Sequence, residues 1–118
     1  MVGPVEYARS EDATLAYRTV GTGSIDVVFV PGILSHMDVF LEEPGLRRFF
    51  ERMGTFCRLI LYDRRGQGMS DALPDDFTLE QEVEDVNTVL DAVGSERAAL
   101  NGYTGGGALA ERARRQAV

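Results

Sequence analysis

A glycine-rich segment near the end of the chain has the residue types and spacing of a turn that presents a hydroxyl nucleophile. Gly102-Tyr103-Thr104-Gly105-Gly106 fits the pattern Gly-x-Ser-x-Gly, with threonine at the serine position. The flanking glycines suit a turn that is too tight for a Cβ atom. A helix that starts after such a turn points backbone N–H groups at a developing oxyanion. The pattern therefore predicts nucleophilic attack by Thr104, with Tyr103 lining the site.

The elements that must position this turn begin with predicted strands. Nearly continuous apolar runs predict buried parallel strands at 25–30 and 57–62, and a shorter strand is predicted at 97–101. The first is followed by Val30-Pro31-Gly32-Ile33 and the second by the glycine-rich loop 63–71. Three loops with distinctive residues thus follow three successive strands, which indicates a common functional edge.

Helices are predicted between these strands. Apolar residues at helical spacing predict one crossover helix over 38–53. Thr78 and Gln81 form a capping-box pattern that predicts a second helix over 78–93. The alternation around Ser10-Glu11-Asp12 predicts an N-terminal antiparallel hairpin. Strands that alternate with helices place the chain in the α/β class, with right-handed crossovers.

The chain resembles the N-terminal part of the α/β-hydrolase family. The likeness is carried by VFVPGILSHMD, EEPGLRRFFERMGTFCRLILYDRRGQGMSD, TLEQEVEDVNTVLDAVGSERAAL and GYTGGG, and it covers essentially residues 1–118 as one domain portion. It is similar in particular to actinobacterial hydrolase domains that accompany adenylate or guanylate cyclase domains. The resemblance implies a partial α/β-hydrolase fold that stops after the nucleophile elbow: an N-terminal hairpin and about three strands of a larger, mostly parallel sheet.

The resemblance also implies a chemistry and a set of site residues. Relatives of this kind hydrolyse small esters or related bonds with a serine-histidine-acid triad. On that pattern, the backbone N–H groups of Ile33 and Gly105 form the oxyanion hole, and Gly32 and His36 line the site. No cofactor and no metal are expected.

The chain departs from the family pattern in two respects. In this fold the acid and the histidine follow the nucleophile, but only 14 residues follow Thr104, and the single histidine, His36, precedes it. We expect His36 to be a loop residue bordering the site. The β-branched Thr104 also adds strain to a turn that is already strained. Without the base, turnover is expected to fall by about a millionfold, which leaves roughly 10³ to 10⁴ over water.

Three hypotheses about function remain open. The first is a truncated hydrolase-like protein that is weak or inactive alone. The second is a hydrolase with Thr104 as nucleophile, completed by a second chain or by His36 through a rearranged loop. The third is a non-enzymatic interaction module, in which the strand 97–101 lies at an open sheet edge and pairs with a partner or with another copy.

Composition excludes some classes of partner. The formal net charge of −7 and the isoelectric point of about 4.6 have the wrong sign for nucleic acid or an anionic membrane surface. The start lacks a signal-peptide pattern and no apolar run is long enough to span a membrane, so we expect a cytoplasmic protein. All 12 basic residues are arginine, as in GC-rich genomes.

Several polar residues and the cysteine are expected to be structural. Cys57 opens an apolar run, where a buried thiol is common. Asp63 and Arg64 could form an acid and anion-binding pair, but a structural role is favoured. Ser70 and Asp71 fit turn and cap chemistry.

Overall fold

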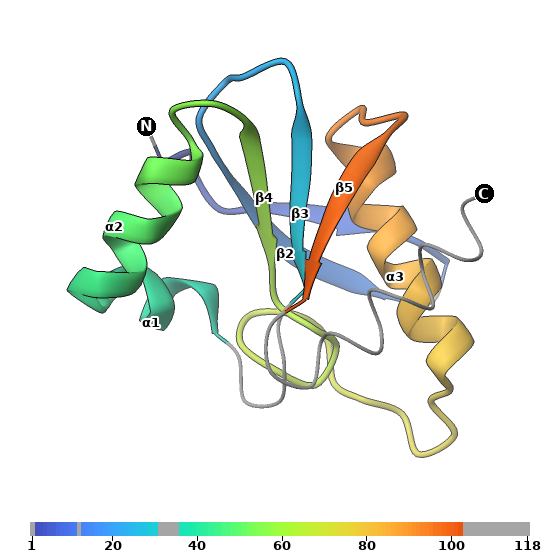
Figure 1. Cartoon of the computed structure of the whole chain (residues 1–118). Helices are drawn as coiled ribbons and strands as arrows, with labels where there is room; N and C mark the ends of the chain where they lie inside the picture. The colour runs from blue at the N-terminus through green and yellow to red at the C-terminus, as the bar shows by residue number, and fades with distance from the viewer. Residues whose placement is uncertain (1, 12, 31–35, 103–118) are drawn as a thin grey trace.

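The protein is described by a computed structural model that covers residues 2–11, 13–30 and 36–102 (Figure 1). Its elements follow in the order β1 (Glu6–Arg9), β2 (Thr14–Val20), β3 (Asp26–Val30), α1 (Met37–Glu42), α2 (Pro44–Met53), β4 (Arg58–Tyr62), α3 (Leu79–Ala92) and β5 (Ala98–Gly102).

The strands form one sheet in the order β1-β2-β4-β3-β5. The hairpin of β1 and β2 is antiparallel, and β2 also runs antiparallel to β4. The strands β4, β3 and β5 are mutually parallel. The predicted hairpin and the predicted parallel strands are therefore confirmed, and β5 lies at the edge of the described sheet, as expected.

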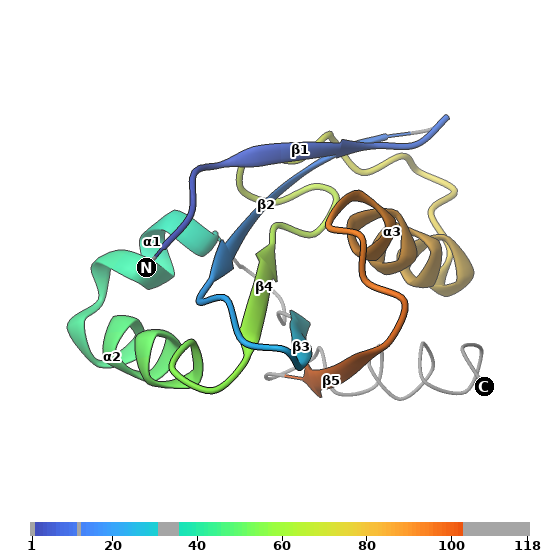
Figure 2. The same cartoon turned by 90° about the horizontal axis from the view of Figure 1, so that it is seen from above.

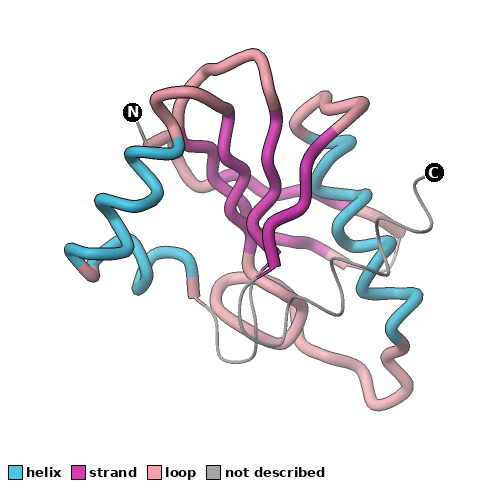
Figure 3. Tube along the Cα trace, in the orientation of Figure 1, coloured by secondary structure: helices cyan, strands magenta, loops and turns pink. Residues whose placement is uncertain are grey.

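Helices cover both faces of the sheet. Seen from above, α1 and α2 lie on one side of the central strands and α3 lies on the other (Figure 2). Tracing the chain by element type shows the same three layers, with the strands between the helices (Figure 3). The fold is a three-layer α/β arrangement.

The strand β4 shows why the central runs are continuously apolar. Ile60 and Tyr62 belong to the core cluster beneath α3, whereas Leu59 and Leu61 belong to the cluster beneath α1 and α2. Successive side chains of a strand point to opposite faces, so a strand covered on both faces needs apolar residues at every position.

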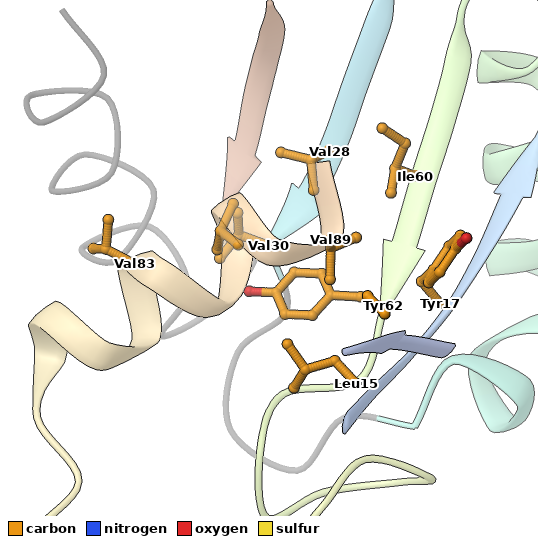
Figure 4. Close-up of a cluster of buried hydrophobic side chains, with 10 residues drawn as sticks. Leu15, Tyr17, Val28, Val30, Ile60, Tyr62, Val83 and Val89 are labelled. Atoms are coloured by element: carbon orange, nitrogen blue, oxygen red, sulfur yellow. The ribbon is translucent and has the colours of Figure 1, made fainter. Parts of the chain in front are cut away.

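The core beneath α3 is built mainly of valines from the helix and side chains from the hairpin and central strands (Figure 4). Its buried members are Ala8, Leu15, Tyr17, Val28, Val30, Ile60, Tyr62, Val83, Val86 and Val89. On the other face, Phe50 of α2 is fully buried and its ring meets Phe29 of β3 edge-on, with centroids 5.2 Å apart. Aromatic pairs prefer this edge-to-face arrangement.

The prediction of one helix over 38–53 was wrong, because the structure has two. Glu43 has extended backbone geometry (φ −77°, ψ 120°) and separates α1 from α2. The residue before a proline is driven out of the helical region, and Pro44 is the first residue of α2. The Glu43 carboxylate then caps α2 by accepting the N–H of Leu46 at 2.6 Å. Gly54 is the C-cap residue of α2, so the helix ends at Met53, the predicted boundary.

The capping box of α3 is confirmed. The Thr78 hydroxyl accepts the N–H of Gln81 at 3.2 Å, and the Gln81 side chain accepts the N–H of Thr78 at 2.8 Å. Together these bonds satisfy backbone donors that a helix start leaves free. Within the described part of the chain, none of the helices has the length and apolar character needed to cross a membrane.

Candidate functional site

The carboxyl ends of the three parallel strands meet at one edge of the sheet. In the register, Phe29 of β3 lies opposite Leu61 of β4, and Val30 of β3 lies opposite Gly102 of β5. The segments that follow these strands therefore start side by side, at the edge where open α/β sheets bind ligands. In Figure 1 the arrowheads of β3, β4 and β5 converge at this lower edge.

The three predicted catalytic residues, Thr104, Ile33 and Gly105, lie outside the described residues. The predicted site-lining residues Gly32 and Tyr103 also lie outside them. The described backbone does fix where the two predicted oxyanion segments begin. Val30 and Gly102, the last described residues before these two segments, are register partners. The bend at Thr104 and the placement of the Ile33 amide stay predictions.

His36 is the predicted site residue that the structure describes, and it stands directly before α1. It occupies the N-cap position, and its side chain makes no capping hydrogen bond. Its Nδ1 atom is buried and has no hydrogen-bond partner among the described residues. Burial raises the pKa of the Asp63 carboxyl group, and the electrostatic interaction with His36 offsets a small part of this rise. His36 is thus held close to Asp63 at the functional edge.

Asp63 is the central polar residue of this edge. Its side chain is fully buried, and burial raises the pKa of the carboxyl group. One carboxylate oxygen accepts the N–H of Met37 at 2.8 Å, and the other accepts the N–H of Met69 at 3.0 Å. The carboxylate therefore joins the start of α1 to the loop after β4. Both hydrogen bonds are structural, in agreement with the structural role predicted for Asp63.

Gly68 makes room for this carboxylate. Its φ of +52° lies in the left-handed region, and a Cβ atom there would stand 2.2 Å from Asp63 Oδ2. Both the backbone conformation and the close approach require glycine at this position. The glycine spacing of the loop is therefore explained by the buried carboxylate that the loop encloses.

Ser70 and Asp71 attach the same loop to the hairpin. The Ser70 hydroxyl donates to the Asp63 carbonyl at 2.6 Å, and its oxygen accepts the N–H of Ala16 at 2.9 Å. The Asp71 carboxylate accepts the N–H of Thr14 at 2.9 Å. Both residues are structural, in agreement with their predicted turn chemistry.

Two arginines attach the loop to α3. Arg65 and Asp85 form a buried ion pair with two hydrogen bonds of 3.1 and 2.6 Å. The Arg65 guanidinium also lies 4.8 Å from the centre of the Phe77 ring. Arg64 pairs with Glu82 at 2.5 Å. The guanidinium of Arg64 is therefore neutralised by a helix carboxylate, which argues against the anion-binding role.

Cys57 has no place in this site. It precedes β4, so it lies at the opposite end of that strand from the functional edge. Its thiol is buried and donates to the Met53 carbonyl at 3.1 Å, and burial raises its pKa. A thiol in these surroundings is a poor nucleophile. No cluster of three potential metal-binding side chains occurs in residues 2–11, 13–30 and 36–102.

Sequence reasoning missed the Arg65–Asp85 pair and the two amides bound by Asp63. Arg65 and Asp85 are 20 residues apart in the chain, and Asp63 is 26 residues from Met37 but only 6 from Met69. The available signal was an aspartate placed directly after a continuously apolar strand. Such a carboxylate is buried unless the chain turns away from the sheet. A buried carboxylate needs hydrogen-bond donors.

Comparisons with known proteins agree with this geometry. The model of the "Alpha/beta hydrolase family" matches residues 27–118. The human mitochondrial palmitoyl-protein thioesterase ABHD10 is 30% identical over 101 residues, which are 86% of this chain and 32% of that protein. This chain thus spans about a third of that relative's length.

Solved structures give the same result. An alpha/beta hydrolase from Sphaerobacter thermophilus is similar with a TM-score of 0.78 and 31% identity, over 94% of this chain and 40% of that one. A proline iminopeptidase-related protein from Thermus thermophilus is similar with a TM-score of 0.78 and 28% identity, over 96% of this chain and 40% of that one. The strand order, the parallel edge and the family match lead to one conclusion: the chain is a member of the α/β-hydrolase family.

Proposed function

We propose that the chain supplies the nucleophile half of an ester-hydrolase site, with Thr104 as the attacking group. The observation that carries this is the register of β3 and β5: the predicted oxyanion segment and the predicted nucleophile turn leave the sheet at paired residues, Val30 and Gly102. In this arrangement the N–H groups of Ile33 and Gly105 would face a tetrahedral intermediate formed at Thr104.

In the proposed mechanism, the Thr104 hydroxyl oxygen attacks the substrate carbonyl while a base takes its proton. The leaving alcohol or thiol departs with a proton, and water then cleaves the acyl-threonine ester. The 118-residue chain has one histidine, His36, which stands beside Asp63. We propose that the base and the acid come from outside these residues, so that the chain alone turns over slowly.

The relatives indicate which substrates to test. The human relative is named a palmitoyl-protein thioesterase, and the solved relatives are hydrolases. We propose acyl esters and acyl thioesters as the substrate class. The cytoplasmic location also stays a proposal.

Labelling with a fluorophosphonate probe tests the nucleophile. Because the base lies outside the chain, the probe should phosphonylate Thr104 only slowly. Thr104→Ser should be labelled faster at the same position, and Thr104→Ala should abolish the label. Thr88→Ala is the matched control, since the Thr88 hydroxyl lies on α3 and donates to the Glu84 carbonyl at 2.9 Å. Unchanged p-nitrophenyl acetate hydrolysis in Thr104→Ala, together with no label at residue 104, would refute the proposal.

A second candidate function is supported by the position of β5. This strand pairs with β3 on one side and is the edge of the described sheet. Such an edge offers backbone donors and acceptors to a further strand from a partner or from another copy. Size-exclusion chromatography with light scattering tests this role. A chain that stays monomeric at all concentrations, and that recovers no specific partner in a pull-down from its native cell, would exclude this role.

A further inference from the structure

The hydroxyl of Tyr62 ends in a small recess between β4, the loop after it and α3. Tyr62 is 3% exposed, and its oxygen has no hydrogen-bond partner among the described residues. The ring points from β4 toward α3, with Val30 and Val89 beside it (Figure 4). A buried hydroxyl without a partner costs free energy, and native proteins leave few of them.

The recess is at the lower limit of the volume that holds one water molecule, and charged side chains are among its lining residues. Its volume is about 10 Å³, and it is lined by Tyr62, Arg64, Arg65, Glu82 and Asp85. Holding a single water requires about 10–15 Å³ on this measure, together with two to four polar partners. The guanidinium groups can donate to a water and the carboxylates can accept from it. The lining residues therefore include both donors and acceptors, although the surface that the recess exposes is mostly apolar.

The charges of the lining favour a neutral occupant over an ion. Arg64 pairs with Glu82, and Arg65 pairs with Asp85, so each positive charge is already balanced. A cation or an anion would leave a net charge in a poorly solvated place, where it is costly. Water adds no charge and satisfies the hydroxyl.

We propose that a structural water binds between the Tyr62 hydroxyl and the Arg64–Glu82 and Arg65–Asp85 pairs. It joins the end of β4 to α3 through both ion pairs and so helps to fix the loop that follows β4 at the functional edge. This site is independent of the proposed ester hydrolysis. The environment also raises the pKa of Tyr62, chiefly through burial, which keeps the hydroxyl protonated and able to donate.

The direction in which Tyr62→Phe changes the stability of the fold tests the site. Tyr62→Phe removes only the hydroxyl, so if a water satisfies it, the equilibrium constant for unfolding should rise about threefold to tenfold. If the hydroxyl has no partner, the same change should leave that constant unchanged or lower it, which would overturn the proposal. Tyr17→Phe calibrates the effect, because Tyr17 lies in the same cluster and its hydroxyl bonds directly to Glu6.

A crystal structure of the full chain at about 1.5 Å resolution identifies the occupant. The expected result is a water peak about 2.6–3.2 Å from Tyr62 Oη and from at least one charged side chain of the recess. The peak should be missing or displaced in Tyr62→Phe. A direct bond from Tyr62 to a side chain with no peak, or a peak with the short contacts of a metal ion, would overturn the proposal.

Discussion

The carboxylate of Asp63 accepts the backbone N–H of Met37 at 2.8 Å and thereby ties the end of β4 to the start of α1. The segment 31–36, which contains the predicted oxyanion donor, lies between β3 and α1. The buried carboxylate thus holds Met37, just after this segment, and the β3 register holds Val30, just before it. The Asp63 contact fixes one boundary of the candidate site without taking part in the chemistry.

Replacing Asp63 by asparagine should destabilise the fold. An asparagine has one acceptor oxygen, so its NH₂ group would face the N–H of either Met37 or Met69. We expect the free energy of unfolding to fall by about 1–3 kcal/mol, measured by urea denaturation. Asp71→Asn is the control, since Asp71 accepts one N–H, from Thr14, and the amide can turn its oxygen to keep that bond. Equal losses in the two variants would contradict the role given to Asp63.

Gly68→Ala should cost more stability than Gly94→Ala. Both glycines have positive φ, +52° and +71°, but a Cβ atom at residue 68 would lie 2.2 Å from the Asp63 carboxylate, whereas residue 94 has nothing within 4 Å. Backbone strain alone is worth about 1–2 kcal/mol, so the excess at Gly68 measures the clash. Thermal unfolding of the two variants gives this difference, and a similar loss in both would show that the loop can move away.

Substitutions of the buried Arg65–Asp85 pair should have strongly non-additive effects on the free energy of unfolding. Asp85→Ala leaves the Arg65 guanidinium buried without its partner and should lower the free energy of unfolding by about 3–5 kcal/mol. The double variant Arg65→Met/Asp85→Leu should recover most of this loss. Glu51→Ala, which breaks the exposed Arg47–Glu51 pair, is the control and should cost less than about 0.5 kcal/mol. A double variant as unstable as Asp85→Ala would contradict the electrostatic explanation.

The Asp26–Arg58 pair should account for part of the loss of fold stability at acid pH. Asp26 and Arg58 are register partners at the start of β3 and β4, and their two hydrogen bonds of 2.7 and 2.9 Å lower the pKa of Asp26. Because the folded pKa lies below the unfolded one, the stabilisation is present above about pH 4 and is lost as the pH falls through the folded pKa. Asp26→Asn should thus cost about 0.5–1 kcal/mol at pH 7 and progressively less toward pH 3. Urea denaturation across this range checks it, and a constant difference would contradict it.

The sequence predicted those elements whose signals are local. The capping box at Thr78 and Gln81 marked the start of α3, and the doubly covered strand β4 could be read from its unbroken apolar run. The break at Glu43 was also encoded, by the proline that follows it, but the helical spacing on both sides concealed it. Local patterns were sufficient where no distant contact competed with them.

The polar contacts of the site could not be predicted in the same way. The loop 63–71 was identified from its glycines, but the reason for Gly68 is a carboxylate that the chain folds beneath it. Likewise, nothing local to Arg65 indicates that its partner is Asp85, on the buried face of a helix. Such contacts depend on tertiary packing, which a single sequence states only indirectly.

The distance between the Thr104 hydroxyl and the Ile33 amide in a crystal structure tests the central claim most directly. A reacting oxyanion must lie about 3 Å from its donor and close to the nucleophile, so the two atoms should be within about 6 Å of each other. We predict this distance, together with a sharp bend of the backbone at residue 104. A separation well beyond about 10 Å, or a straight continuation of β5 past residue 104, would contradict the assignment of this edge as a hydrolase site.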